Sequence, residues 1–337
     1  MQLLSDPQLV GSGTPQQGAF RELNPADFLS REEVTLDTDQ ISGYLTGKTV
    51  LVTGGGGSIG SELCRQVMRF KPGKLLIFDI YENCAYELLM ELQQKYGRDI
   101  PVTVLIGSIR DKKRLDEVFE TYHPTVVFHA AAHKHVPLME VSPAEAVKNN
   151  VLGTKNLLVS ASEHDVERFV QLSTDKAVNP TSVMGCTKRI CEMLIQTFAG
   201  NTDMKCVAVR FGNVLGSHGS VIPLFEAQIK KGGPVTLTDP NIERYFMTIP
   251  EAAQLVLQAG ALAESGNIYV LDMGEPVKIM DLAKQLIRFY GYEPGVNMEI
   301  KIVGLRPGEK LYEELMMDEE QDKMRDRKST RLNSSHN

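Results

Sequence analysis

A glycine-rich turn between an apolar strand and an amphipathic helix restricts the possible folds of this chain more than any other feature. The apolar run KTVLVT (48–53) predicts a buried strand, GGGGSIG follows it, and SELCRQVMRF then has helical spacing. Gly54, Gly57 and Gly60 give the pattern G-x-x-G-x-x-G. Glycines at these positions let backbone N–H groups approach a pyrophosphate at the start of the helix. The turn therefore predicts a dinucleotide-binding site.

The next predicted strand, KLLIFD (74–79), supports this interpretation. It ends in Asp79, 19 residues after Gly60, and a carboxylate about 20 residues after the last glycine binds the adenosine ribose of a dinucleotide. The same carboxylate would repel a 2′-phosphate. We therefore predict NAD, rather than NADP, as the cofactor.

Strands and helices alternate as far as residue 214. Further strands are predicted at 102–107, 125–132, 168–173 and 205–214, and helices at 82–96, 111–122, 143–164 and 182–198. This alternation is typical of a parallel sheet with helices on both faces, and right-handed crossovers predict the strand order 3-2-1-4-5-6. We therefore predict an α/β fold, a Rossmann-type doubly wound parallel sheet, for an NAD-binding domain at residues 47–214.

The pattern is less regular after residue 214. Helices are predicted at 222–231, 250–263, 279–290 and 309–316, with short strands at 234–237, 267–271 and 299–302. They predict a smaller C-terminal α/β lobe at residues 215–320 that mainly binds substrate. The polar residues 1–46 are predicted to form a linker or arm, and residues 321–337 a disordered tail that resembles translated cloning sequence.

Composition excludes several classes of function. The net charge of −7 argues against a general nucleic-acid surface, and no run approaches the about 20 apolar residues of a membrane span. The five cysteines form no C-x-x-C pair and are expected to stay reduced, as in a cytoplasmic protein. His129, His133 and His135 lack the companion ligands of a tetrahedral site, so no metal is predicted.

Reactive side chains crowd the stretch that follows the predicted strand 168–173. Thr174, Asp175 and Lys176 leave its carboxyl end, where open α/β sheets bind their ligands. Met184 and Lys188 are four residues apart on the following helix and therefore lie on one face. This stretch is the candidate catalytic centre.

Taken together, these motifs resemble the extended short-chain dehydrogenase/reductases. Those enzymes normally carry Y-x-x-x-K, whereas this chain has Met184 and Lys188 in M-x-x-x-K. With HKHVPLME (133–140), STDKAVNPT (173–181), RFGNVLGSHGSVIPLF (210–225) and GLRPGEKLYEEL (304–315), the chain is similar to the nucleotide-sugar 4,6-dehydratases of bacterial polysaccharide and glycan biosynthesis. The similarity is to the branch that acts on UDP-N-acetylglucosamine and retains the C5 configuration.

The resemblance implies an NAD-dependent hydro-lyase that forms a UDP-4-keto-6-deoxy sugar. It implies Asp175 as the acid at the C6 hydroxyl, Lys176 as the base at C5, and Thr174 at the C4 oxygen. Lys188 is expected at the nicotinamide ribose, and burial together with Lys188 is expected to lower the pKa of Lys176. Met184 cannot ionise or donate a hydrogen bond, so the C4 hydroxyl proton goes to water, Asp175 or Lys188; the sequence leaves this open.

The remaining expected contacts fall into two sets. The cofactor is expected to contact the glycine turn, the acid after the second strand, and small residues after the third and fourth strands: Gly54, Gly57, Ser58, Ile59, Gly60, Asp79, Ser108, Ile109, Ala130, Ala131, Ala132 and Lys188. By similarity, and because arginine donates bidentate bonds to phosphate, the expected substrate contacts are His133, Lys134, Asn150, Arg210, Asn213, Arg244 and Arg306.

The resemblance also implies a homodimer through helices 143–164 and 182–198. Residues 21–34 resemble a linker to a membrane-anchored part of longer family members, which would place this portion at the cytoplasmic face of the inner membrane. Two alternatives remain. A UDP-sugar 4-epimerase of the same fold would use tyrosine and need no Asp-Lys pair, and a non-catalytic NAD- or nucleotide-sugar-binding regulator would need neither Asp175 nor Lys176.

Overall fold

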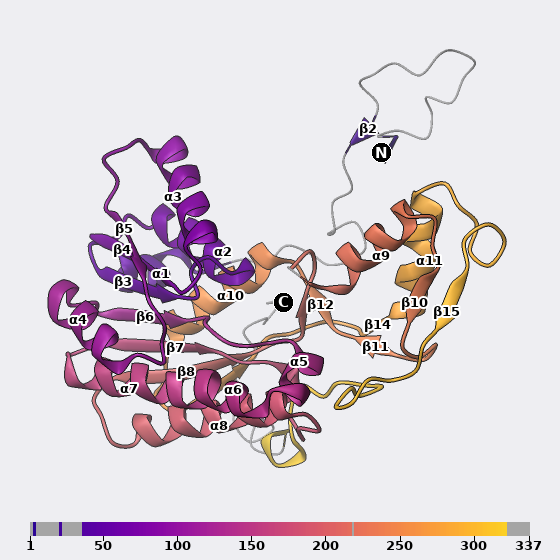
Figure 1. The fold of residues 1–337 in the computed structure, drawn as a ribbon. Coiled ribbons are helices and arrows are strands. Elements are labelled where there is room, and N and C mark those ends of the chain that lie inside the picture. The colour runs from indigo at the N-terminus through magenta and orange to yellow at the C-terminus, as the bar shows by residue number, and fades with distance from the viewer. Residues whose placement is uncertain (1–2, 5–19, 22–35, 218, 322–337) are drawn as a thin grey trace.

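A parallel sheet of seven strands forms the centre of the computed structural model, which describes residues 3–4, 20–21, 36–217 and 219–321. The strand order is β13-β8-β7-β6-β3-β4-β5 (Figure 1). The strands are β3 (Thr49–Thr53), β4 (Lys74–Asp79), β5 (Val102–Ile106), β6 (Val126–His129), β7 (Arg168–Leu172), β8 (Lys205–Arg210) and β13 (Ile268–Val270). The first six strands of this sheet, taken in chain order, lie as 3-2-1-4-5-6, so the predicted doubly wound fold is confirmed.

The sheet is covered on both faces because its strands are apolar on both sides. In β3, Val50 and Val52 belong to one buried cluster and Leu51 to the other, as expected when successive side chains point to opposite faces. One face is covered by α2 (Ser58–Arg69), α3 (Glu82–Tyr96) and α10 (Ile249–Leu262). The other is covered by α4 (Lys112–Tyr122), α7 (Gly153–Glu163) and α8 (Val183–Ala199).

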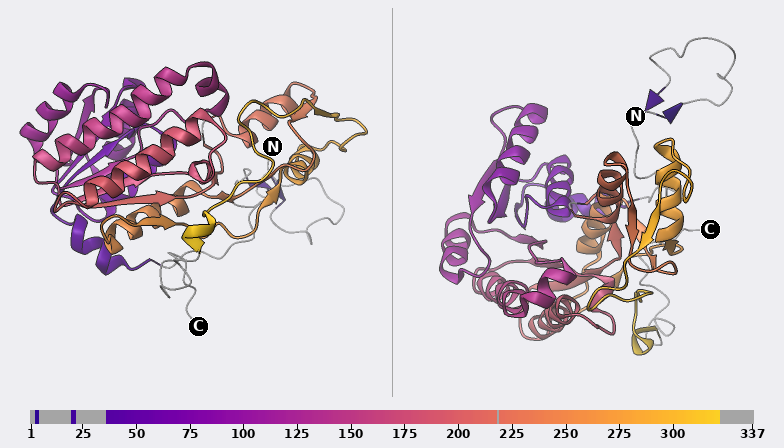
Figure 2. Two further views of the ribbon diagram at one scale, coloured as in Figure 1. Left: turned by 90° about the horizontal axis from the view of Figure 1, so that it is seen from below. Right: turned by 45° about the vertical axis from the view of Figure 1, so that its right-hand side comes forward.

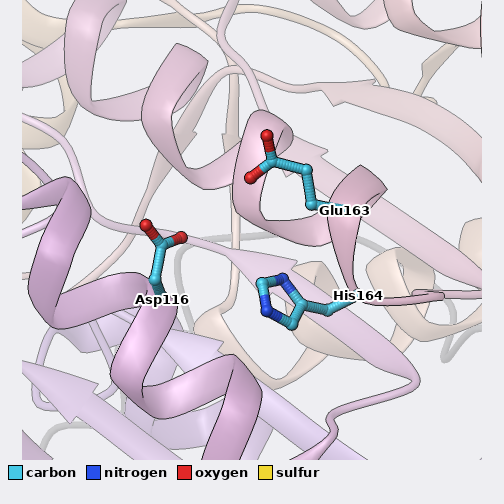
Figure 3. Close-up of side chains that lie close together, drawn as sticks. All are labelled: Asp116, Glu163 and His164. Atoms are coloured by element: carbon cyan, nitrogen blue, oxygen red, sulfur yellow. The ribbon is translucent and has the colours of Figure 1, made fainter.

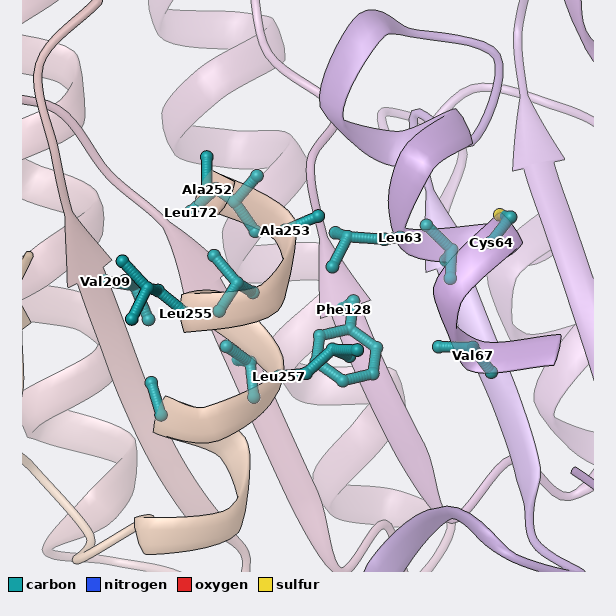
Figure 4. Packing of buried hydrophobic residues seen from close by; sticks show 14 of the residues in the cluster. Leu63, Cys64, Val67, Phe128, Leu172, Val209, Ala252, Ala253, Leu255 and Leu257 are labelled. Carbon is teal, nitrogen blue, oxygen red and sulfur yellow. The ribbon is translucent and has the colours of Figure 1, made fainter. Parts of the chain in front are cut away.

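Two elements beyond residue 214 pack with the sheet rather than with the lobe. Strand β13 pairs with β8 in parallel, and α10 packs against the sheet beside α2 (Figure 4). Ala252, Ala253 and Leu257 of α10 are fully buried there, and the two alanines let the helix approach closely. Part of the range 215–320 thus completes the seven-stranded sheet, while its predicted role in binding substrate stays a prediction.

A short helix lies within the predicted linker 1–46. Helix α1 (Thr38–Leu45) buries Ile41, Tyr44 and Leu45 against α10, and the Tyr44 hydroxyl donates to the carbonyl of Leu257 at 2.7 Å. Three apolar residues at helical spacing dock this segment, a signal too short to stand out in a polar stretch. Strands β1 (Leu3–Leu4) and β2 (Phe20–Arg21) pair antiparallel; the rest of 1–35, the predicted linker 21–34 and the tail 322–337 lie outside the described residues.

The lobe has its own buried cluster and stands beside the sheet (Figure 2). It contains helices α9 (Val221–Lys230) and α11 (Ile279–Phe289). Its strands pair two by two: β9 (Asn213–Val214) with β12 (Phe246–Met247), β10 (Val235–Leu237) with β15 (Ile300–Ile302), and β11 (Glu243–Arg244) with β14 (Val277–Lys278).

The predicted helix 143–164 is interrupted by a π-helical segment. Helix α6 (Pro143–Ala146) continues into the π-helical residues Val147–Leu152 and then into α7. Asn150, in that segment, is fully buried. Its side chain bonds both backbone groups of His133, at 2.8 and 3.0 Å, and donates to Thr187 at 3.0 Å. The π-helical segment therefore holds the loop that joins β6 to α5 (Val136–Val141).

The predicted helix 309–316 is wrong, because that segment is irregular. We call residues 304–321 the C-terminal strap. The Arg244 guanidinium donates to the carbonyls of Lys310 and Leu311 at 2.7 and 3.1 Å, and the N–H of Glu243 donates to Leu311 at 3.1 Å. Carbonyl groups that a helix would use for itself are bound by neighbouring elements, so the strap runs across the lobe.

Candidate active site

A cleft of about 680 Å³ lies between the carboxyl ends of the strands and the lobe. It is lined by the glycine turn, by the loops after β6, β7 and β8, by α9 and by the C-terminal strap. The sequence-predicted residues in its lining are Gly54, Gly57, Ser58, Ile59, Gly60, Ala130, Ala132, His133, Lys134, Thr174, Lys176, Met184, Lys188, Asn213, Arg244 and Arg306.

The glycine turn has room only for glycine at its two ends. Gly54 has a φ of +67°, and a Cβ there would lie 2.7 Å from the backbone nitrogen of Ala131. A Cβ on Gly60 would collide with the carbonyl oxygen of Gly54. Gly57 caps α2 without a side chain, so the positive end of the helix dipole opens into the cleft. This geometry fits the pyrophosphate of a dinucleotide.

Asp79 lies beneath the glycine turn. One carboxylate oxygen accepts the N–H of Gly56 at 2.8 Å and the other accepts the N–H of Tyr81 at 2.9 Å. Each oxygen keeps a further lone pair that could accept a ribose hydroxyl. Ser108, Ile109 and Ala131 are near this end of the cleft but are not part of its lining; Ile109 is buried, where its side chain would meet any Cβ added to Gly153.

The catalytic candidates come together in a 3₁₀ turn, Asp175–Ala177, directly after β7. The Thr174 hydroxyl donates to Asp175 Oδ1 at 2.8 Å, and Lys176 Nζ donates to the same oxygen at 3.0 Å. Asp175 is fully buried, and its Oδ2 has no partner among the described residues. A buried carboxylate oxygen without a partner is costly, which marks this turn as a site built for a ligand or a reaction.

The pKa of Lys176 differs in direction from the sequence prediction. Burial lowers the pKa of its ammonium group, but the carboxylates of Asp175 and Glu313 raise it by more, so the pKa lies above its ordinary value. The predicted lowering by burial is present, but the predicted net decrease is wrong, because the two carboxylates outweigh it. Lys188 instead lies on α8, where its ammonium donates to the carbonyl of Leu172 at 2.5 Å.

Sequence reasoning missed Glu313. This residue lies in the C-terminal strap, its side chain is 3% exposed, and its Oε1 is 3.5 Å from Lys176 Nζ. Its Oε2 is buried without a partner among the described residues. The motif GEKLYEEL contains it, but the predicted helix 309–316 gave no reason to bring it to the turn after β7.

Met184 and Lys188 lie one above the other on α8 and both line the cleft. Met184 is 3% exposed and packs against Met139 and Ala146. Burial lowers the pKa of Lys188 from its ordinary value. The predicted pairing of these two side chains on one face is confirmed, and the thioether forms an apolar wall beside the ammonium group.

The predicted substrate contacts are only partly brought together. His133 and Lys134 line the cleft, while Asn150 lies behind them and fixes their loop. Asn213 accepts a bond from Lys176 Nζ at 3.4 Å. Arg306 is exposed at the cleft.

Arg210 does not reach the cleft. Its side chain is fully buried and makes hydrogen bonds to both oxygens of Glu192, both oxygens of Glu320 and the carbonyl of Leu315. Both ends of the fork are occupied, so the prediction that Arg210 binds the nucleotide or diphosphate is corrected: it anchors the strap to α8. An arginine at the end of a strand gives the same sequence signal whether it binds phosphate or anchors another segment of the chain.

Two histidine-containing groups have structural explanations. His129 is fully buried in neutral form between Thr53 and Thr154, at 2.7 and 2.9 Å, because burial lowers its pKa to about 3. Asp116, Glu163 and His164 lie close together (Figure 3) and are not part of the lining of the cleft. There, Lys112 pairs with Asp116 and with Glu163, so an ammonium group already balances both carboxylates.

The sequence matches the family described as "Polysaccharide biosynthesis protein" over residues 50–334. It is 56% identical over 308 residues to the capsular polysaccharide biosynthesis protein CapD of Staphylococcus aureus, a match that covers 91% of this chain and 51% of that protein. The chain thus spans about half the length of that relative.

More distant relatives carry two different reaction names. A UDP-N-acetylglucosamine 4,6-dehydratase (inverting) of Campylobacter jejuni is 34% identical, covering 79% of this chain and 76% of the relative. A UDP-glucose 4-epimerase of Rickettsia rickettsii is 37% identical, covering 83% and 80%. The X-ray structure of Pen from Bacillus thuringiensis superposes with a TM-score of 0.77 at 37% identity, covering 82% of this chain and 86% of that one. Within the described residues, none of the helices has the length and apolar character needed to cross a bilayer.

Proposed function

The chain belongs to the polysaccharide biosynthesis protein family, a group of nucleotide-sugar dehydratases and epimerases with the extended short-chain dehydrogenase/reductase fold, and on this premise we propose that it is an NAD-dependent UDP-N-acetylglucosamine 4,6-dehydratase. The observation that carries the proposal is the pair Asp175 and Lys176, hydrogen-bonded at 3.0 Å beside the cleft. Elimination of water needs an acid and a base side by side. An epimerase moves a hydride and the C4 hydroxyl proton but eliminates no water, so it needs no such pair.

The cofactor in this proposal is NAD. The glycine turn would hold its pyrophosphate, Asp79 its adenosine ribose, and Lys188 its nicotinamide ribose. When bound, NAD supplies the acceptor and later the donor of a hydride. The residues of the chain supply the proton transfers and hold the sugar.

The proton transfers follow from the turn after β7. Asp175 acts as the acid that protonates the leaving C6 hydroxyl. Lys176 removes the C5 proton after its own ammonium proton has passed to solvent. The acidity of that proton comes from the 4-keto group. Both side chains belong to one 3₁₀ turn, so they can act on neighbouring carbons of one sugar.

The proton of the C4 hydroxyl has a short route to the acid. Thr174 donates to Asp175 Oδ1 at 2.8 Å. Thr174 accepts the C4 hydroxyl proton while it passes its own proton to Asp175. Asp175 is then protonated, and this proton later leaves with the C6 hydroxyl as water. Two O–H bonds break, at the C4 oxygen and at Thr174, and two form, at Thr174 and at Asp175. This route needs no tyrosine, which agrees with Met184 at that position.

The UDP end of the substrate would meet the C-terminal strap. Arg306 is exposed at the cleft, whereas the guanidinium of Arg244 is largely used by the carbonyls of residues 310 and 311. We therefore assign the diphosphate first to Arg306 and give Arg244 the task of holding the strap. His133, Lys134 and Asn213 would surround the sugar.

One assay tests the proposal. The protein is incubated with UDP-N-acetylglucosamine and NAD in deuterated water, and ¹H NMR should show a UDP-4-keto-6-deoxy sugar with deuterium at C5. Lys176→Ala should lose at least about 100-fold in the rate of C5 exchange. Lys48→Ala, which removes a lysine paired with Glu167 at the amino ends of β3 and β7, should keep it. Exchange at a near wild-type rate in Lys176→Ala would refute the role of Lys176.

The same spectrum separates the alternatives. A 4-epimer in place of the keto sugar identifies a UDP-sugar 4-epimerase, and substrate that remains unchanged in the presence of NAD favours a binding regulator. The inverted C5 configuration in the product would contradict the retaining branch that the M-x-x-x-K motif favours.

A homodimer through the helical ranges 143–164 and 182–198 is also part of the proposal. Apolar side chains stay exposed on α5, on the π-helical segment and on α8: Leu138, Val141, Val147, Leu152, Ile190 and Met193. Sedimentation should give a dimer mass, and Met193→Glu should shift it toward the monomer. The cytoplasmic location stays a prediction.

A further inference from the structure

We propose that Glu313 is a positioning residue of this site, whose carboxylate holds Lys176 as an ammonium ion opposite Asp175 and so sets the pH range in which Lys176 can act. The inference rests on the proposed role of Lys176 as the base. It concerns a residue that lies 137 positions further along the chain, on the C-terminal strap.

Lys176 lies between two acids that come from different parts of the fold. Its Nζ is 3.0 Å from Asp175 Oδ1 and 3.5 Å from Glu313 Oε1. The Lys176 side chain is 21% exposed, while those of Asp175 and Glu313 are 0% and 3% exposed. Charges at these distances, shielded from water by burial, interact more strongly than surface pairs.

Glu313 is not needed to hold the strap in place. Its Oε1 faces Lys176 and Arg244, the latter at a longer 3.8 Å, and its Oε2 has no hydrogen-bond partner among the described residues. The strap is attached by other bonds, which include those from Arg244 to the carbonyls of residues 310 and 311. A buried carboxylate with an open oxygen costs stability, which suggests that its charge serves another purpose.

The surrounding charges define the sign of the effect. The groups that act on Lys176 are Asp175 and Glu313, which favour the ammonium form, and Arg244, which opposes it. Burial and the Asp175 carboxylate raise the pKa of the Glu313 carboxyl above its ordinary value, whereas Lys176, Arg244 and Lys310 favour the carboxylate. Removal of the charge on Glu313 therefore leaves Lys176 with one acid and Arg244, and its proton should be lost at lower pH.

The test compares Glu313→Gln with Glu314→Gln. Glu314 is the next residue on the strap and pairs with Lys310 at 3.1 Å, but its side chain is 50% exposed. In Glu313→Gln, the acid-side limb of the pH profile for C5 exchange should move to lower pH by about one unit or more, as expected for the loss of an opposite charge at this distance. Glu314→Gln should leave the limb where it is.

A second measurement does not depend on turnover. Lysine labelled with ¹³C at Cε is followed by NMR from about pH 7 to 12 without substrate, since the ordinary lysine pKa is about 10.4. Lys176 is assigned by its absence in Lys176→Arg. Its midpoint should fall in Glu313→Gln. Glu313→Asp, which keeps a carboxylate but withdraws it by one methylene group, should give a smaller shift in the same direction and covers the case in which the glutamine variant does not fold.

The outcomes are distinct. A Lys176 midpoint that is unchanged in both Glu313 variants would overturn the inference, as would a lower exchange rate without movement of the limb, which is the result expected of a merely structural residue. If the wild-type protein forms no keto sugar, the proposed function fails, but the NMR titration still decides whether Glu313 controls the charge of Lys176.

Discussion

The substitution Arg210→Met separates the two interpretations of this arginine. Arg210 is fully buried, and its guanidinium makes two bonds of 3.0 and 2.8 Å to Glu192 and two of 2.7 and 3.2 Å to Glu320. Methionine fills similar volume but leaves the buried Glu192 carboxylate with only Arg189 and Ser173. Breaking a buried pair in this way typically costs about 3–5 kcal/mol of unfolding free energy.

For a chain of this size, such a loss corresponds to a Tm lower by roughly 4–8 °C. Circular dichroism during heating and guanidinium denaturation would measure it. Arg189→Met is the matched control, because Arg189 bonds the same Glu192 at 2.9 Å but its side chain is 27% exposed; it should cost less than about 1 kcal/mol.

A double variant sharpens the result. Glu192→Gln combined with Arg210→Met should cost less than the sum of the two single variants, because both charges leave together. If Arg210→Met instead melts within about 2 °C of the wild type and raises the KM for the UDP-sugar, Arg210 binds substrate and the structural interpretation is refuted.

Three further predictions follow from single contacts. Gly54→Ala should abolish NAD binding and should lower the Tm several times as much as Gly97→Ala. Both glycines have positive φ, but only a Cβ on Gly54 meets backbone atoms. Thermal melts and the amount of NAD released on denaturation measure this. Tyr44→Phe should cost about 1 kcal/mol in denaturant unfolding, because it removes a buried hydrogen bond to the carbonyl of Leu257. Burial raises the pKa of Glu320, but bonds from Arg210 and the Met317 N–H lower it by more. The contribution of Glu320 to the stability of the fold is therefore complete above about pH 4.3 and is lost as the pH falls through the lower folded-state pKa. Glu320→Gln should therefore lower the Tm at pH 7 and lose that difference toward pH 3.

The sheet could be predicted because its signals are local. Strand β4 and helix α3 have the predicted bounds, 74–79 and 82–96, since an apolar run and an amphipathic period are visible in neighbouring residues. The seventh strand is different. Ile268–Val270 joins the sheet beside β8 after 57 intervening residues, and no local pattern says to which sheet a three-residue strand belongs.

The site was predictable where it depends on one short segment and not where segments meet. Thr174, Asp175 and Lys176 are consecutive, so their proximity follows from the sequence itself. Glu313 reaches Lys176 only because Arg244 binds the strap carbonyls and prevents a helix. Arginine is also the residue type that binds phosphate, so the sequence alone does not show which role Arg210 has. Only the positions of Glu192 and Glu320 show that its hydrogen bonds are already made.

The π-helical segment at 147–152 makes the number of residues in this helix important for the position of Asn150. A π-turn holds one residue more than the α-turn it replaces. Deleting one residue there would restore a regular helix and spare both flanking helices, but it would rotate Asn150 by about 100° away from the backbone of His133. When relatives are aligned, a gap of one position in this helix therefore separates proteins that can fix the loop after β6 from proteins that cannot, although their percentage identity would hardly change.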